Sequence, residues 1–248
     1  MRRPRAKEEI LSDAARKPDS IGNRILAGLS RKEYARIAAD LVRVTLKPGQ
    51  VLYEPGGVMQ WAYFLETAIV SILSQAEDGT SIEVSLVGSE GVIGIPIVLR
   101  SLVLPYRVVV QGPGTAWRMK ADGLRKEFDR CGPLHKLLLR YVHTLIVQLA
   151  QSSACNRFHS TRQRLCRWLL ASEDLSGSSE LRSTQEFLSQ MLGVNRGSAN
   201  QAASSLQRAG LIRYRRGRIT ILDRSGLETA ACECYRIIRS EFDRFFRR

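Results

Sequence analysis

Amide and guanidinium side chains gather in one short stretch near the C-terminus. Asn195, Arg196, Asn200 and Gln201 lie close together in the sequence. Asparagine or glutamine can form two hydrogen bonds to adenine, and arginine can do the same to guanine, which discriminates against a wrong base by roughly 1–3 kcal/mol. Ser198 adds a hydroxyl that can contact several bases. These residue types at this spacing favour base recognition.

The same stretch is basic and has no compensating acid. Residues 187–222 contain six arginines and no aspartate or glutamate. Five of these arginines follow the candidate base contacts, and we expect them to bind phosphates, which set affinity and register more than sequence preference. They are Arg208, Arg213, Arg215, Arg216 and Arg218. A solvated basic face is the alternative, and the absence of acids argues against it.

Two short helices must position these side chains. Ser183-x-x-Glu186 has the pattern of a capping box that opens a first helix, and Gly193 supplies the turn because glycine tolerates a positive φ. Asn195 then caps a second helix. Two helices joined by a short glycine-containing turn form a helix-turn-helix. The apolar residues expected between them are Leu188, Leu192, Val194, Ala199, Ala202, Ala203 and Leu206.

A basic hairpin is expected after the second helix. LIRY and ITIL have the pattern of two short strands around the turn Arg215-Arg216-Gly217-Arg218. Such a wing can lie along phosphates while the second helix enters the major groove. We therefore predict a winged helix-turn-helix over residues 157–227, with double-stranded DNA as its partner.

The charge of the whole chain agrees with this location. The 248 residues hold 38 Lys+Arg and 24 Asp+Glu, a net charge of +14, which predicts attraction to nucleic acid or to an anionic membrane surface. Residues 151–248 alone hold 17 basic side chains, all arginine, and 9 acidic ones. Because this excess coincides with the helix-turn-helix, we expect the polyanion to be DNA and not a membrane.

Several classes of protein do not fit the sequence. No run reaches the ~18 apolar residues of a transmembrane helix, and no apolar segment of a secretory signal follows the first basic residues. We therefore expect a cytoplasmic protein in which residues 1–20 form a basic flexible tail. No glycine-rich phosphate loop, His-Glu-x-x-His or Gly-x-Ser-x-Gly motif occurs, so no catalytic residue is assigned and no enzyme is expected.

The cysteines and histidines are not expected to bind a metal. The five cysteines are odd in number and scattered, which fits reduced thiols. Only Cys232-x-Cys234 is closely spaced, and without a second ligand pair we interpret it as two thiols on a helix. His135, His143 and His159 are interpreted as partly buried histidines on helix surfaces. We predict no metal and no cofactor.

The middle of the chain predicts short strands. After a helix capped by Ser30, alternating segments separated by turn signals over residues 42–120 predict an antiparallel barrel or roll of eight or so strands. The candidates are VRVTL, QVLYE, WAYFLE, AIVSILS, SIEVSLV, GVIGIPIVL, YRVVVQ and TAWRM. Helical spacing returns at Ala121–Asp129 and in the long segment after Pro133.

The long helix expected over residues 133–156 is apolar on two faces. One set of residues has the a/d spacing of a coiled-coil seam: Leu138, Val142, Leu145 and Leu149. The set expected to pack back on the roll is Leu134, Leu137, Tyr141 and Ile146. We predict a dimerisation helix, with a helix buried in one chain as the alternative. Residues 228–248 predict a C-terminal amphipathic helix.

The order of these parts, from about Ile21 to Leu227, resembles the Crp/Fnr family of bacterial transcription regulators. The most specific segment is TQEFLSQMLGVNRGSANQAASSLQRAGLIRYRRGRITILD, and KPGQVLYEPG and SLVGSEGVIG contribute from the roll. The resemblance implies an α+β fold with a cyclic-nucleotide-binding-like jelly roll over residues 21–132, the dimerisation helix and the winged helix-turn-helix. It also implies a homodimer on a two-fold symmetric operator with half-sites about one helical turn (~34 Å) apart, and RNA polymerase as a further partner.

The resemblance also allows the sensing chemistry to be compared. Family members that bind cyclic AMP have a Gly-Glu-x-Gly turn and an Arg-Ser/Thr pair; here the turn is Gly91-Val92-Ile93-Gly94, and residues 104–106 supply no such pair. Arg100 or Arg107 could substitute only with a shifted strand register. The candidate effector site is therefore Gly91, Val92, Gly94, Arg100 and Arg107.

We expect an effector other than cyclic AMP, or none. The alternatives are a cyclic-nucleotide-dependent activator and an enzyme with a regulatory roll. No cysteine precedes Cys131, so the iron–sulfur centre that oxygen-sensing relatives hold before the roll is not expected. The family's Arg-Glu…Arg triplet appears as Arg196-Gly197…Gln201, which predicts a different operator sequence.

Overall fold

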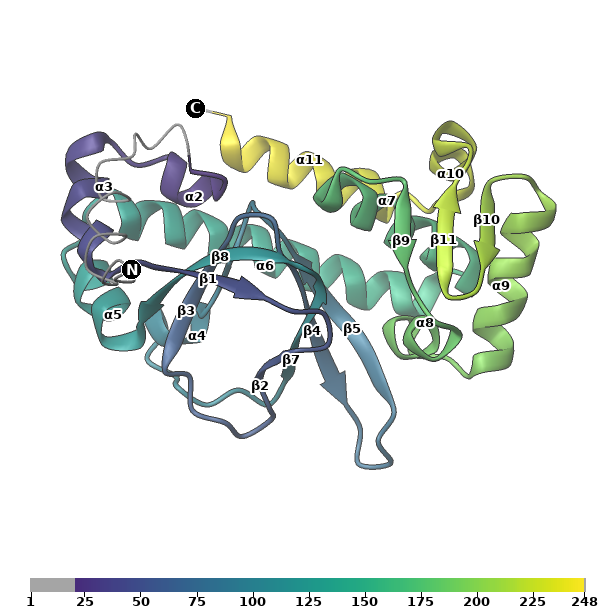
Figure 1. Cartoon of the computed structure of the whole chain (residues 1–248), viewed down its shortest axis with the longest axis horizontal. Helices are drawn as coiled ribbons and strands as arrows, with labels where there is room; N and C mark the ends of the chain where they lie inside the picture. Colours follow the sequence, from purple (N-terminus) through teal and green to yellow (C-terminus); the bar gives the residue numbers. More distant parts are fainter. Residues whose placement is uncertain (1–20, 248) are drawn as a thin grey trace, which may run out of the picture. The chain divides into compact units, whose positions relative to one another are not determined.

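The computed structural model describes residues 21–247 (Figure 1). The expected basic tail, residues 1–20, lies outside the described residues. The chain forms two compact units: the described residues up to Val70 together with Val87–His143, and Ser71–Leu86 together with the residues from Thr144 onward. The domain boundaries expected from the sequence stay predictions.

Two four-stranded sheets form the roll, with strand orders β1-β8-β3-β6 and β2-β7-β4-β5 (Figure 1). The strands are β1 (Val42–Leu46), β2 (Val51–Tyr53), β3 (Trp61–Leu65), β4 (Ile69–Gln75), β5 (Ser81–Val87), β6 (Val92–Ile93), β7 (Arg107–Gly112) and β8 (Gly114–Lys120). β8 pairs antiparallel with β1 and with β3. The α+β class and the roll over residues 42–120 are confirmed.

The segment GVIGIPIVL differs from its expectation as one strand. Only Val92–Ile93 is a strand, because Gly94 adopts φ +130 and ends it. The short helix α4 (Ile95–Val98) follows, with a proline in its first turn, where a missing N–H leaves no helical hydrogen bond unmade.

Short helices flank the strands of the roll. They are α2 (Arg24–Ala27), α3 (Arg31–Ile37), the 3₁₀ turn η2 (Ala38–Asp40) and α5 (Ala121–Asp129). The predicted cap of α3 is confirmed, since the Ser30 side chain and Glu33 form a complete capping box. The predicted helix Ala121–Asp129 is confirmed at both ends.

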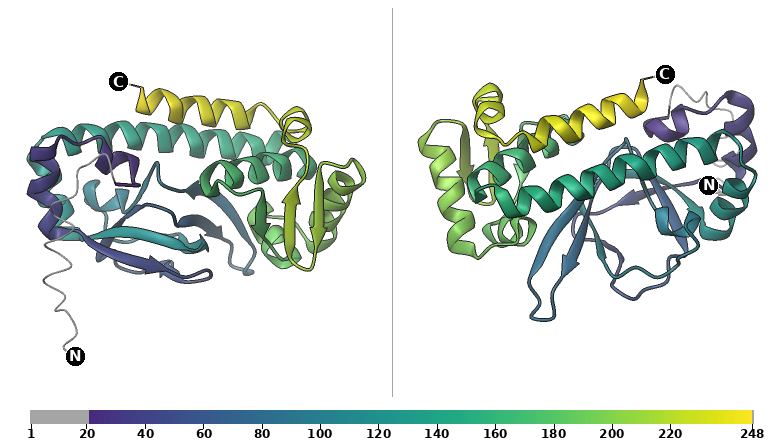
Figure 2. Two further views of the ribbon diagram at one scale, coloured as in Figure 1. Left: turned by 45° about the horizontal axis from the view of Figure 1, so that its top comes forward. Right: turned by 180° about the vertical axis from the view of Figure 1, so that it is seen from behind.

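Helix α6 (Pro133–Phe158) is 26 residues long, and Figure 2 shows it as one long helix. Its buried face includes Leu134, Leu138 and Tyr141, all at most 1% exposed. Its exposed apolar residues include Ile146 at 59% and Leu149 at 39%. The expected division into two faces is therefore wrong at two positions: Leu138 is buried in the core of its own chain, and Ile146 is exposed.

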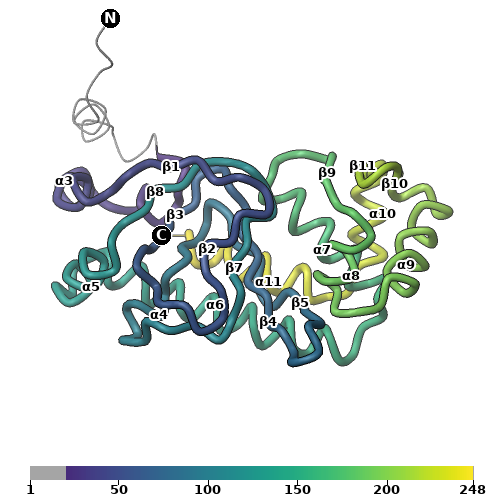
Figure 3. Tube along the Cα trace, turned by 60° about the horizontal axis from the view of Figure 1, so that its bottom comes forward, coloured from purple at the N-terminus to yellow at the C-terminus, as the bar shows by residue number. Residues whose placement is uncertain are grey.

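The C-terminal elements form a helical group around a three-stranded sheet of order β10-β11-β9 (Figure 3). They are α7 (Thr161–Ser176), β9 (Glu180–Arg182), α8 (Gln185–Leu192), α9 (Arg196–Arg208), β10 (Ile212–Arg215) and β11 (Arg218–Ile221). This confirms a helix-turn-helix followed by a two-stranded wing, and adds β9 as a third strand. None of the described helices combines the length and the apolarity that a membrane crossing needs.

The expected single C-terminal helix is in fact two helices, α10 (Arg224–Ala230) and α11 (Cys234–Phe246). Ala231 adopts an extended conformation between them. In one continuous helix, residues two apart point about 200° away from each other, so Cys232 and Cys234 would face opposite sides. The break allows both thiols to face the same group of residues, described below.

Candidate nucleic-acid interface

Caps and a glycine turn set the ends of α8 and α9. The Asn195 side-chain oxygen accepts a hydrogen bond from the Ser198 N–H at 2.8 Å, and Gly193 ends α8 at φ +58; both features are as predicted. The capping box at Ser183 is wrong by one residue, because the Thr184 hydroxyl accepts from the Phe187 N–H instead. The Ser183 N–H donates to the carbonyl of Gly217 in the turn of the wing, so Ser183 is held beside the hairpin just after β9 and does not cap α8.

Small apolar side chains hold α9 against its neighbours. Five residues of the predicted set are at most 2% exposed: Leu188, Leu192, Ala199, Ala203 and Leu206. Ala202 is buried as well, and Val194 is half-buried. Alanine allows close approach of helix backbones, so α9 is fixed by its inner face and leaves its outer face free for a ligand.

The outer face of α9 presents the candidate base contacts. Asn195, Arg196, Asn200 and Gln201 are exposed, and Ser198 is half-buried. Arg196 forms an ion pair with Glu186 of α8. The Asn200 oxygen accepts from the Gln185 amide at 3.0 Å, which orients the asparagine while leaving its own N–H groups available.

The wing places its arginines on one face. Arg215 is opposite Arg218 in the ladder, and Arg213 is opposite Thr220. These residues and Arg216 line one open hollow on the surface. The alternate residues of the two strands, Ile212, Ile219 and Ile221, are buried. A strand alternates its side chains between two faces, so the hairpin buries isoleucines and exposes cations.

The backbone of the wing's turn and the hydrogen bonds of Tyr214 fix the position of the wing. Arg216 and Gly217 adopt φ values of +49 and +72, as a two-residue hairpin turn requires. The Tyr214 N–H is donated to the Gln207 side chain at 2.7 Å, and its hydroxyl to the Ser183 carbonyl at 3.0 Å. The first bond fixes the wing to α9 and the second fixes it to the connection between β9 and α8, and Figure 1 shows β10 beside α9. Arg208 is exposed at the end of α9.

The candidate effector residues do not form one group of free polar side chains. Val92 is 2% exposed and apolar. Arg100 pairs with Asp129 at 2.8 Å, and Arg107 pairs with Glu54 at 3.2 Å.

The two glycines of this set have structural reasons to be glycine. A Cβ at Gly91 would lie 2.4 Å from the Tyr141 hydroxyl, so Gly91 allows α6 to pack on the turn. A Cβ at Gly94 would lie 2.9 Å from that of Ala62, and its φ of +130 is unfavourable for other residues.

Two domain models match this chain. The model of the cyclic nucleotide-binding domain matches residues 43–131, and that of the Crp-like helix-turn-helix domain matches residues 163–230. This pair of domains, in this order, decides the family. The chain belongs to the Crp/Fnr family of transcriptional regulators. It is a Crp/Fnr-type transcription regulator with a cyclic-nucleotide-binding domain and a DNA-binding helix-turn-helix.

Solved structures of Crp/Fnr regulators share this fold. FixK2 from Bradyrhizobium japonicum aligns with a TM-score of 0.66 at 13% identity, over 77% of this chain and 98% of its own. A CRP-family transcriptional regulator from Thermus thermophilus gives 0.64 at 20%, over 77% and 96%. CLP from Xanthomonas campestris, described as a c-di-GMP responsive global regulator, gives 0.63 at 16%, over 77% and 98%. No curated protein matches the sequence.

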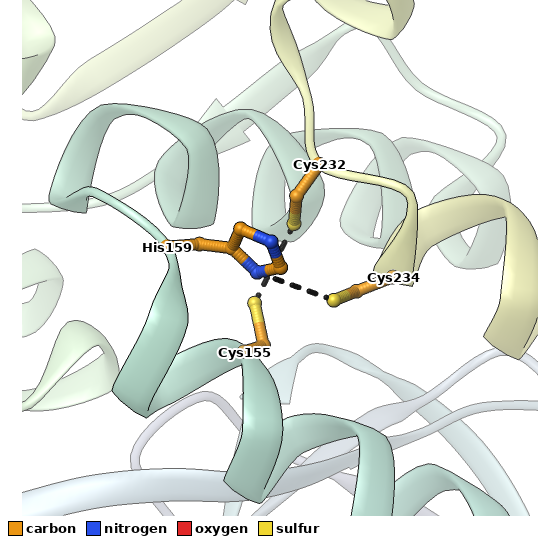
Figure 4. A group of neighbouring side chains, drawn as sticks. All are labelled: Cys155, His159, Cys232 and Cys234. Carbon is orange, nitrogen blue, oxygen red and sulfur yellow. Dashed lines mark hydrogen bonds between the residues drawn. The ribbon is translucent and has the colours of Figure 1, made fainter.

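A second group of reactive side chains lies in the same unit as the helix-turn-helix of this Crp/Fnr regulator. Cys155, His159, Cys232 and Cys234 bring one donor atom each to within 4.8 Å of one another (Figure 4). A hydrogen bond from the Cys232 thiol lowers the pKa of Cys155 to about 5. Burial raises the pKa of Cys234.

The sequence shows no second pair of donor residues near Cys232-x-Cys234, but the fold brings such a pair beside it. The second pair is Cys155-x-x-x-His159 at the end of α6. Its spacing of four residues, which puts two side chains on one side of a helix, was the available signal in the sequence.

Proposed function

We propose that this Crp/Fnr regulator binds a two-fold symmetric DNA operator as a homodimer, with one α9 in the major groove of each half-site. The main observation in support of this proposal is that Asn195, Arg196, Asn200 and Gln201 are exposed at the start of α9. The wing beside them has an exposed face lined by arginines. The first turns of a recognition helix are the part that reaches base edges. A cytoplasmic location is part of the same proposal, and binding to DNA would agree with it.

The test of operator recognition is selection from random DNA. The full chain is used to enrich a randomised duplex library, and the affinity of the selected duplex is compared with that of a scrambled duplex at one salt concentration. We expect a palindrome with half-site centres about 10 base pairs apart, bound at least about 10³-fold more tightly than the scrambled duplex. Equal affinity for both duplexes would contradict the proposal.

The homodimer is supported by an exposed apolar stripe on α6. Leu139, Val142, Ile146 and Leu149 follow one another at steps of 3, 4 and 3, the a/d spacing of a two-helix seam. Leu139 and Ile146 are 46% and 59% exposed. A second copy of α6 would cover this stripe, and the two-fold axis would relate the two α9 helices.

The effector of the roll is proposed not to be cyclic AMP. A buried valine at position 92 cannot accept a ribose hydroxyl, and the two candidate arginines, Arg100 and Arg107, already pair with carboxylates. CLP has a similar fold and is described as c-di-GMP responsive, which supports an effector other than cyclic AMP for this fold. An effector would act by changing how the two α6 helices of the dimer pack against each other. The regulator would contact RNA polymerase while it is bound to the operator.

Isothermal titration calorimetry with cyclic AMP and with cyclic GMP separates the two effector hypotheses. We expect no heat of binding at micromolar ligand. Micromolar binding of either nucleotide would instead support a cyclic-nucleotide-dependent activator. In that case operator affinity measured with and without the nucleotide would show whether the ligand controls DNA binding.

A further inference from the structure

The strongest unassigned feature is the group of three thiols and one imidazole in the C-terminal unit. Cys155 lies in the last turn of α6, His159 directly after it, Cys232 in the connection from α10 to α11, and Cys234 at the start of α11. The three cysteines are at most 4% exposed. Figure 4 shows the four side chains pointing toward one another from these separate segments.

The distances fit a single tetrahedral ion. Zinc lies about 2.3 Å from sulfur and about 2.0–2.1 Å from nitrogen, so its ligand atoms are roughly 3.5–3.8 Å apart in a tetrahedron. The Cys155 and Cys232 sulfurs are 3.5 Å apart, and the Cys234 sulfur is 3.4 Å from Nδ1 of His159. The other pairs of donor atoms lie within 4.8 Å of one another, so small side-chain movements would bring all four to one ion.

The surroundings are those of a metal-binding histidine. Nε2 of His159 lies 3.3 Å from the Glu233 carboxylate. Metal-bound histidines commonly donate their second ring N–H to a carboxylate, which fixes the tautomer and the orientation of the ring. The amide of Gln151 donates to the Cys234 sulfur at 3.1 Å, a further contact that stabilises a thiolate.

The charge balance also fits. Three thiolates and one Zn²⁺ carry a net charge of −1. Arg164 and Arg167 of α7 both interact electrostatically with Cys155, and Arg164 is only 7% exposed. These two arginines, of which Arg164 is buried and Arg167 is half-buried, offset the charge that a tris-thiolate zinc site would place in the interior.

From this geometry we infer that Cys155, His159, Cys232 and Cys234 bind one Zn²⁺ as a closed structural site. Soft thiolate ligands select zinc over harder cations, and three cysteines with one histidine leave no position for water or substrate. Binding replaces the three thiol protons with the ion, and the protons pass to solvent. The ion would fix α10 and α11 to the end of α6 and the start of α7.

The test is metal analysis of the full-length chain, purified under reducing conditions without a histidine tag. We expect about one zinc per chain in the wild type, since a closed site binds a single ion. Cys232→Ser should lose the zinc, and Cys131→Ser, which changes an exposed thiol outside the group, should keep it. His159→Cys retains four ligands and should also keep it, which separates loss of a ligand from loss of folding.

Two further measurements address the same site. Cobalt added to the metal-free protein should give the visible absorption of a tetrahedral ion with thiolate ligands. Glu233→Gln should weaken zinc binding by about 10–100-fold while leaving the four ligands in place. A reduced wild-type protein that binds neither zinc nor cobalt, or a Cys155–Cys232 disulfide in metal-free protein as isolated, would overturn the inference.

The role of the ion in stability is measured by thermal unfolding. A ligand that binds only the folded state raises the melting temperature, so a chelator should lower the Tm of the wild type and leave that of Cys232→Ser unchanged. An equal response of both proteins would contradict a structural zinc. None of these readouts depends on DNA binding, so their failure is distinguishable from failure of the proposed function.

Discussion

Arg196 stands at the first position of α9, where its side chain is 72% exposed and paired with Glu186. The pair holds the guanidinium beside the outer face of the helix, and an exposed ion pair of this kind contributes little to stability. Arg196 is therefore available to exchange its carboxylate partner for a guanine edge. Arg215, on β10 in the wing, has only the phosphate backbone as its expected partner.

Replacing Arg196 with alanine should relax the preference at one base pair of each half-site. The loss of a two-bond contact to guanine corresponds to about 1–3 kcal/mol of discrimination. The measurement is fluorescence anisotropy with the selected operator and with single-base variants of it. An unchanged preference at every position would show that Arg196 makes no base contact.

Replacing Arg215 with alanine should weaken binding to all duplexes alike. Removal of one phosphate contact lowers the slope of log Kobs against log salt concentration by about 1. Binding to operator and scrambled duplexes is measured between low and moderate salt. If Arg196→Ala and Arg215→Ala change sequence preference and salt slope in the same way, the assignment of base and phosphate contacts is incorrect.

At the scale of elements, α6 combines a buried face with an exposed apolar stripe. The stripe is Leu139, Val142, Ile146 and Leu149, and its members are more exposed than Leu134, Leu138 and Tyr141 on the buried face. Water contact with so many large apolar side chains is unfavourable, and a second α6 would remove it.

Ile146→Glu should shift the protein from dimer to monomer. A charge in an apolar seam is costly to bury, and Ile146 is the most exposed member of the stripe. Sedimentation velocity gives the mass of each variant. Lys136→Glu is the control, because Lys136 is exposed on α6 outside the stripe and should leave the dimer intact; a dimeric Ile146→Glu would place the interface elsewhere.

At the scale of the whole molecule, stability depends on acids that folding removes from water. Glu83 of β5 is 6% exposed, accepts from the Ser71 hydroxyl at 2.8 Å and lies 3.5 Å from the indole nitrogen of Trp168 on α7. Burial raises the pKa of Glu83 above its ordinary 4.5, and burial raises that of Glu90 as well.

The contribution of Glu83 to the free energy of unfolding should therefore fall as the pH rises above the ordinary pKa of 4.5. A folded-state pKa above the unfolded value means that the folded protein holds the proton more tightly, so this contribution is complete at low pH and is lost through the folded pKa. Glu83→Gln keeps a hydrogen-bond acceptor and removes the titration. In urea unfolding from pH 4.5 to 8, the free energy of unfolding of the wild type should decrease relative to that of Glu83→Gln as the pH rises, and identical pH profiles would contradict a raised pKa of Glu83.

The sequence by itself determined the features that depend on residues close together in the chain. The cap at Asn195, the turn at Gly193, the arginine-rich wing and most strands of the roll were predicted correctly, because caps, turns and alternation are local interactions. The arginine run also located the excess positive charge, and with it the DNA-binding unit.

Only the tertiary structure decided the features that depend on distant residues. The cap of α8 moved from Ser183 to Thr184 because β9 pairs with β11 through Arg182 and the Ser183 N–H bonds to Gly217. Periodicity showed that α6 has apolar faces, and the elements packed on it decided that Leu138 is covered and Ile146 is not. Cys155 and Cys232 are 77 residues apart in sequence. Their sulfurs come together because the chain breaks between α10 and α11, and no local sequence pattern predicted that break.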